Sequence, residues 1–141
     1  MAGLGPRGFG AMPAAFACAL LAGCAVPQSG PPAGDLRSAR LACNAQYPQK
    51  TGNYLPHAVC VNAAVERYAV PTARHPDLIR LQEEVRWRLS EKIDRRLISP
   101  QIGERRMREA DALVAEVEHD RSTGRETAAV GKIAAVEALL R

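Results

Sequence analysis

Four cysteines and three histidines carry the most distinctive chemistry in this sequence of 141 residues. Cys18 and Cys24 lie within and directly after an apolar N-terminal segment, whereas Cys43 and Cys60 lie further along the chain. A cysteine sulfur can form a thioether, a disulfide or a bond to a metal ion, depending on its compartment and its neighbours. The segments around each cysteine therefore decide between these three chemistries.

Residues 1–23 have the composition of an export signal. Arg7 supplies one positive charge, an apolar run from Phe9 to Leu21 follows, and two small residues precede Cys24. A membrane-spanning helix needs about 20 apolar residues, so this run is too short to cross a bilayer. Its length is typical of a signal peptide. The sequence therefore predicts that residues 1–23 are removed on export, together with Cys18.

The junction Leu21-Ala22-Gly23-Cys24 resembles the lipobox of bacterial lipoproteins. The resemblance implies that Cys24 receives a diacylglycerol as a thioether, that the chain is cleaved before Cys24, and that the new N-terminus is acylated, for example with palmitate. Several acyl chains make a stable anchor, and no other cofactor is expected. Because Ala25 rather than Asp follows, the resemblance implies the periplasmic side of a Gram-negative outer membrane. The alternative is a secreted protein cleaved near Ala22.

Cys43 and Cys60 remain as an even pair in an oxidising compartment, which favours a disulfide between them. The bridge would close a loop of 17 residues, which the chain-entropy estimate values at about 3 kcal/mol. The alternative is a metal or redox site in which His57 joins Cys43 and Cys60, with His75 as a fourth ligand. The absence of a C-x-x-C motif argues against that alternative.

The expected organisation is a signal peptide (1–23), a flexible tether rich in Pro and Gly (24–34) and an all-α domain (35–141). Asp35 is the expected N-cap of a first helix that ends before Pro48, and Pro56 is expected to open a second. The disulfide would close these two helices into an antiparallel hairpin.

Two further helices are expected to form a second hairpin. An apolar stripe at helical spacing runs from Leu78 to Leu97, after a start signal at Pro76, and Ser99 and Pro100 begin the next helix. Gly103 is a mild weakness in its first turn. Residues 100–140 are either one long helix or two helices, the second starting with a capping box from Thr123 to Glu126. The sequence thus predicts four or five helices.

Charge is distributed unevenly along the second hairpin. Residues 86–108 carry eight basic and three acidic side chains, whereas residues 109–120 carry five acidic side chains and no Lys or Arg. We expect a basic turn whose arginines can bind anionic groups of the cell envelope. The arginines at issue are Arg95, Arg96, Arg105, Arg106 and Arg108. The alternative is a solvated helix surface that neutralises itself.

The net charge of +4 is too small to indicate a nucleic-acid partner, and no nucleophile or acid–base motif surrounds the histidines. The sequence therefore predicts a non-enzymatic, membrane-anchored module that binds an envelope protein, peptidoglycan or anionic lipid, or associates with itself. A periplasmic metal or redox protein using His57 is the alternative. Residues 40–120 also resemble small uncharacterised helical envelope proteins of proteobacteria, through Cys43, Cys60 and Pro76-Asp77-Leu78, and that resemblance implies no activity.

Overall fold

The computed structural model describes residues 34–141, and every regular element in that range is a helix. The elements are α1 (Leu36–Gln46), α2 (Tyr54–Tyr68), the short 3₁₀ helix η1 (Val70–Thr72), α3 (Pro76–Asp94), α4 (Pro100–Ser122) and α5 (Glu126–Ala138). The all-α prediction is confirmed, and residues 100–140 form two helices. Cys24, the expected signal peptide and all of the expected tether except Gly34 lie outside the described residues.

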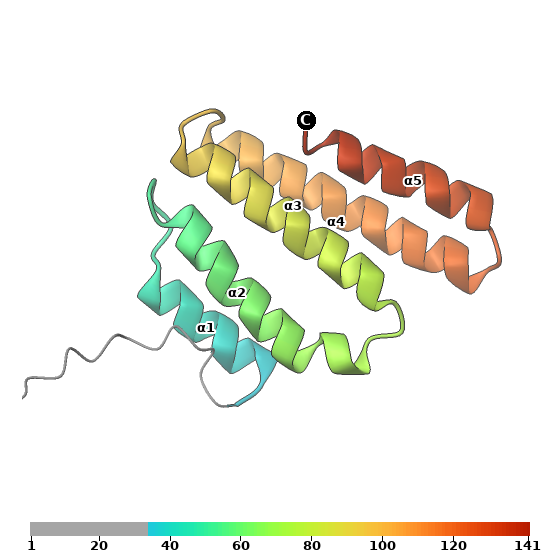
Figure 1. Ribbon diagram of the computed structural model, residues 1–141, viewed down its shortest axis with the longest axis horizontal. Helices are drawn as coiled ribbons and strands as arrows, with labels where there is room; N and C mark the ends of the chain where they lie inside the picture. The colour runs from blue at the N-terminus through green and yellow to red at the C-terminus, as the bar shows by residue number, and fades with distance from the viewer. Residues whose placement is uncertain (1–33) are drawn as a thin grey trace, which may run out of the picture.

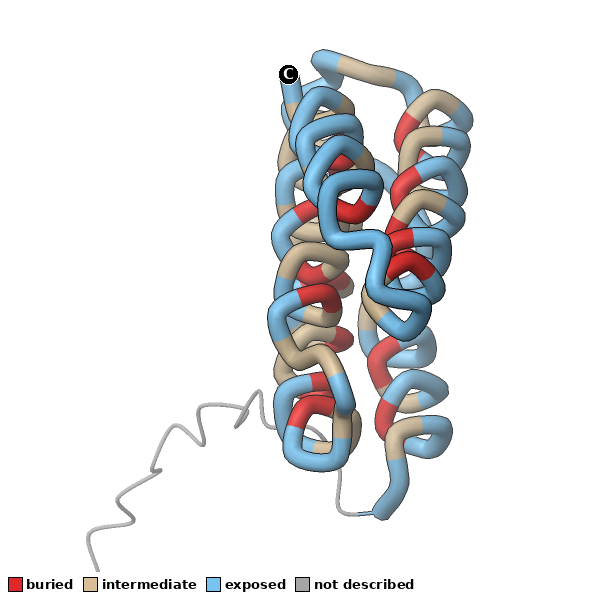
Figure 2. Tube along the Cα trace, turned by 90° about the vertical axis from the view of Figure 1, so that its right-hand side faces the viewer, coloured by how far each residue is buried: buried red, intermediate tan, exposed pale blue. Residues whose placement is uncertain are grey.

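The helices follow one another as an antiparallel array in which each packs mainly against its neighbours in the chain (Figure 1). Buried residues lie mostly on the sides of the helices that face other helices (Figure 2). The helix ends consequently gather at two poles. We call the end that holds the α3–α4 turn the turn pole, and the end that holds the α4–α5 turn and the start of α1 the far pole. No helix within residues 34–141 is long and apolar enough to span a bilayer.

The predicted helix starts depend on local capping and are largely confirmed. The Asp35 carboxylate accepts a hydrogen bond from the Ser38 N–H at 2.9 Å, and the Ser99 hydroxyl accepts one from the Ile102 N–H at 3.3 Å. Helix α2 begins at Tyr54, slightly before the predicted Pro56. Proline is tolerated there because first-turn N–H groups lack partners within the helix.

The core consists of two clusters of small aliphatic side chains. The larger cluster joins α3, α4 and α5, and its buried members are Leu78, Val85, Leu89, Ala110, Val114, Val117, Ala129 and Val136. The smaller cluster joins α1, α2 and η1, and its buried members are Cys43, Val61, Val65 and Val70. Few buried residues hold α1 against the rest of the domain, so a covalent bond to α1 should contribute most to keeping this helix in place.

A disulfide between Cys43 and Cys60 supplies that attachment. The two sulfurs are 2.05 Å apart and the Cα atoms 5.8 Å apart, within the usual range for a disulfide. The bond links the later part of α1 to the middle of α2, so the predicted closure of the first hairpin is confirmed.

The end of α3 differs from the prediction. Helix α3 ends at Asp94, and Arg96 adopts a positive φ of 59°. The N–H groups of Leu97 and Ile98 bond back to the Lys92 carbonyl oxygen. The apolar stripe was therefore wrongly extended to Leu97, whose side chain is 66% exposed at the turn pole.

Gly103 has a packing role that its helix propensity does not indicate. It is buried in the first turn of α4, and a Cβ atom there would lie 2.5 Å from Ile93 Cδ1. The missing side chain lets α3 and α4 approach closely beside their turn.

The break between α4 and α5 lies where it was expected, but the predicted capping box is wrong. Gly124 has a φ of 73°, which ends α4 in the left-handed conformation that glycine favours. The Thr123 hydroxyl donates backwards to the His119 carbonyl oxygen at 3.0 Å, and Arg125 is the N-cap of α5 without a side-chain capping bond.

Glu83 is a buried carboxyl between α2 and α3, and its Oε1 atom has no hydrogen-bond partner among the described residues. Burial, and secondarily the neighbouring Glu66, raises the pKa of Glu83 to about 7. The folded protein therefore holds a proton on Glu83 at pH values where the unfolded chain has lost it.

The contribution of Glu83 to stability is expected to fall as the pH rises from about 4.5 to about 7, because in this window the folded state holds a proton on Glu83 that the unfolded state has lost. The Glu83→Gln variant should lose this decline and be more stable than the parent at about pH 8. Urea unfolding across this pH range measures the effect. The control Glu84→Gln, at an exposed residue paired with Arg88, should keep the parental slope. An equal slope in Glu83→Gln and the parent would contradict the assignment.

Candidate functional site

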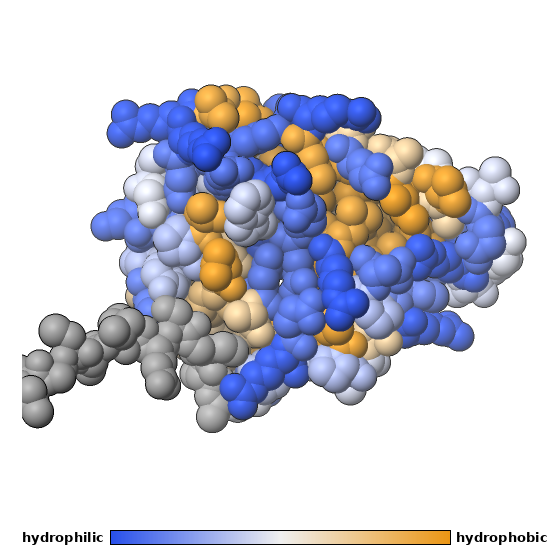
Figure 3. Space-filling model, viewed as in Figure 1, coloured by the Kyte–Doolittle hydropathy of each residue, from blue (hydrophilic) through white to orange (hydrophobic). Residues whose placement is uncertain are grey.

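The basic side chains predicted to bind an anionic partner lie in the α3–α4 turn and in the first half of α4. The α3–α4 turn is held by the backbone bonds to the Lys92 carbonyl oxygen and by the Ser99 cap of α4. Hydrophilic side chains extend from this turn at the upper left of Figure 3, beside a small hydrophobic patch. The turn itself thus exposes Arg95 and Arg96, whereas the other three arginines belong to α4.

The five predicted arginines have different environments. Arg95 pairs with Glu91 at 3.0 Å on the same helix. Arg106 is half-buried and donates to the Leu139 carbonyl oxygen at 3.1 Å, so it stabilises the end of α5. Arg96, Arg105 and Arg108 are exposed, and none of them makes a side-chain hydrogen bond or ion pair within residues 34–141. These three, which we call the free arginine set, are available to a partner.

Other charged groups at the turn pole stabilise the fold. The Asp94 carboxylate accepts hydrogen bonds from the N–H groups of Gly52, Tyr54 and Leu55, at 2.6, 3.3 and 2.8 Å. It therefore caps the N-terminus of α2 from the end of α3. Lys92 Nζ donates to the carbonyl oxygens that follow α5, at 2.5 and 3.0 Å.

Two of the five acidic side chains in residues 109–120 of α4, Glu116 and Asp120, pair with cations that follow α4 in the chain. Lys132 Nζ bridges Glu116 at 2.8 Å and Asp120 at 2.7 Å. Arg125 also pairs with Asp120, whose side chain is only 3% exposed. The hydrogen bond from Lys132 is the main cause of the lowered pKa of Asp120. The predicted acidic stretch thus persists in part, because Glu109, Asp111 and Glu118 make no ion pair within residues 34–141.

The disulfide occupies both sulfurs that the alternative metal site requires. His57 Nε2 lies 2.6 Å from Asn44 Oδ1, and burial followed by the charge of Arg86 lowers the pKa of His57. His75 precedes α3 at the far pole, whereas His57 lies in the first turns of α2 at the turn pole. Residues 34–141 contain no group of three His, Cys, Asp or Glu side chains able to hold a metal ion.

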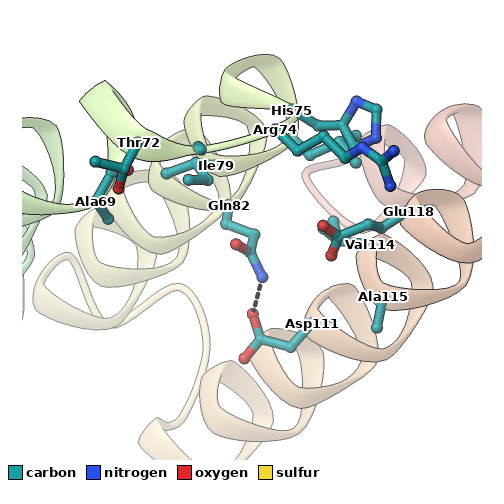
Figure 4. A pocket seen from close by; sticks show the side chains of 12 residues that line it. Ala69, Thr72, Arg74, His75, Ile79, Gln82, Asp111, Val114, Ala115 and Glu118 are labelled. Atoms are coloured by element: carbon teal, nitrogen blue, oxygen red, sulfur yellow. Dashed lines mark hydrogen bonds between the residues drawn. The ribbon is translucent and has the colours of Figure 1, made fainter. Parts of the chain in front are cut away.

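A cavity of about 370 Å³ lies between η1, α3 and α4, towards the far pole (Figure 4). Gln82 crosses it and donates a hydrogen bond to Asp111 at 3.0 Å. Arg74, His75 and Glu118 lie together on one side of it. Sequence analysis missed this cavity, because its walls come from elements whose relative positions depend on tertiary packing.

Among known proteins, the chain matches no family model, no curated protein sequence and no solved structure.

Proposed function

We propose that this chain is a non-enzymatic envelope lipoprotein, anchored through Cys24, whose α3–α4 turn binds carboxylates of the cell wall. The observation that carries the proposal is the free arginine set, with Arg96 exposed in the α3–α4 turn and Arg105 and Arg108 exposed in the first half of α4. An exposed guanidinium can hold a carboxylate in a bidentate pair. Peptidoglycan presents such carboxylates in the compartment that the lipobox resemblance implies.

An anchor at Cys24 would leave the turn pole accessible to a cell-wall partner. Helix α1 begins at the far pole, so the expected tether would join the domain opposite the free arginine set. The poles are separated by roughly the length of α3, about 28 Å at 1.5 Å per residue. A domain attached at the far pole leaves its turn pole free to reach away from the bilayer.

Charge reversal of the free arginine set tests the proposal. The mature protein is expected to sediment with purified peptidoglycan at low salt and to lose at least about tenfold in affinity on Arg96→Glu, Arg105→Glu and Arg108→Glu together. Screening weakens exposed ion pairs, so high salt should also release the parent protein. Co-sedimentation across a salt series measures both effects.

A matched control exists at the far pole. Arg37, Arg67 and Arg74 are exposed there, and their reversal to Glu changes the net charge by the same amount. This variant should bind peptidoglycan like the parent. Equal loss in both triple variants would show that only net charge matters and would overturn the proposal. Binding to phosphatidylglycerol vesicles but not to peptidoglycan would overturn the assignment to the cell wall.

A further inference from the structure

A second, smaller cleft of about 190 Å³ lies between α2, α3 and α4 near the turn pole. Helices α3 and α4 supply its apolar lining, and all three helices supply polar side chains. The lining residues used below are Tyr54, His57, Arg86, Leu89, Ile93, Glu104 and Met107. Pockets for drug-sized ligands measure about 300–1,000 Å³, so this cleft suits a smaller molecule.

Arg86 is a half-buried cation that is held in place on this lining. Its NH1 group donates to Asn62 Oδ1 at 2.5 Å, and Asn62 Nδ2 in turn donates to the Glu83 carbonyl oxygen at 3.0 Å. Asn62 therefore orients the guanidinium while engaging only NH1. The Nε and NH2 edge, which can bind a carboxylate in a bidentate pair, makes no ion pair within the described chain.

Arg86 lacks the carboxylate partner that two other half-buried cations, Arg121 and Lys132, have. Arg121 pairs with Asp77 at 2.7 Å, and Lys132 pairs with two carboxylates. Within residues 34–141 the side chain of Arg86 hydrogen-bonds only to the neutral Asn62, and Arg40 of α1 adds positive charge nearby.

Burial, followed by Arg40, lowers the pKa of Arg86. Asp111 and Glu83 act in the opposite direction, with smaller effects than Arg40. Neither carboxylate forms an ion pair with Arg86, and a half-buried cation without a directly paired anion is unfavourable. A bound anion would supply that direct partner.

We propose that this cleft binds a small organic carboxylate with an apolar body. The carboxylate pairs with the Nε and NH2 edge of Arg86, and the apolar body packs on Leu89, Ile93 and Met107. Glu104 is the one carboxylate on the lining of this cleft, and its negative charge opposes the binding of an anion. The site is separate from the free arginine set, and either proposal can fail without the other.

Titration of the mature protein with benzoate and hexanoate, followed by ¹H–¹⁵N NMR, tests this proposal. Saturable shifts are expected for residues that line the cleft, with weaker binding of inorganic phosphate and none of hexanol. Arg86→Gln should weaken benzoate binding at least about tenfold. Arg88→Gln, one turn away and paired with Glu84 on the surface, should leave it unchanged.

Glu104→Gln supplies a test that does not depend on a buried substitution. Because Glu104 is exposed, this variant should fold like the parent and should bind benzoate at least about twofold more tightly. Unsaturable or scattered shifts in the parent would overturn the proposal. Equal affinities in the parent and Glu104→Gln, or equal losses in Arg86→Gln and Arg88→Gln, would overturn it as well.

Discussion

Reduction of the Cys43–Cys60 disulfide is expected to lower the free energy of unfolding by about 3 kcal/mol. The bond joins residues 17 apart, and its removal restores loop entropy to the unfolded chain. The loss should be concentrated in α1, which packs mainly against α2 through a small cluster. Urea unfolding with and without dithiothreitol measures the total effect. Amide exchange should show loss of protection in α1, while α4 keeps its protection.

A variant without the two sulfurs provides the control for the reductant itself. Cys43→Ala with Cys60→Ala should unfold at the same urea concentration with and without dithiothreitol. Its α1 helix should exchange as fast as in the reduced parent. Identical unfolding midpoints for the oxidised and reduced parent would contradict the prediction, as would equal loss of protection in α1 and α4.

Features that depend on a few consecutive residues were predictable from the sequence. Asp35 and Ser99 cap helices because each side chain reaches an N–H group three residues along the chain. Pro76 and Pro100 start helices because a first-turn residue needs no N–H partner. The disulfide followed from counting the cysteines that export would leave. Each of these inferences requires no knowledge of where another helix lies.

Features that depend on packing between helices were not predictable in the same way. The exposure of Leu97 follows from the positive φ of Arg96, which ends the helix before the apolar stripe ends. Gly103 was interpreted as a weakness of its helix because the sequence does not show that Ile93 of α3 packs against it. The acidic stretch of α4 was counted without Lys132, which comes from α5. In each case the environment of the residue depends on a neighbour from another helix or on a backbone conformation that composition does not reveal.

Asp94→Ala is expected to lower the free energy of unfolding by about 2 kcal/mol, because it removes the cap of α2. Asn53 occupies the N-cap position, but its side chain donates to the Pro48 carbonyl oxygen at 2.9 Å and caps nothing. The first-turn N–H groups of α2 instead bond to Asp94, about 40 residues away. These bonds also join the end of α3 to the start of α2, so α1 and α2 together should become easier to detach from α3.

Asp94→Asn and Asp35→Ala separate the tertiary contribution of Asp94 from capping alone. Asparagine keeps one acceptor oxygen without the charge, so its loss of stability should be smaller than that of alanine. Asp35→Ala removes an exposed cap within one helix, and its effect should be confined to α1. Urea unfolding ranks the three variants, and amide exchange locates the effects. A change below about 0.5 kcal/mol in Asp94→Ala would show that water replaces the carboxylate and that packing alone holds α2 against α3.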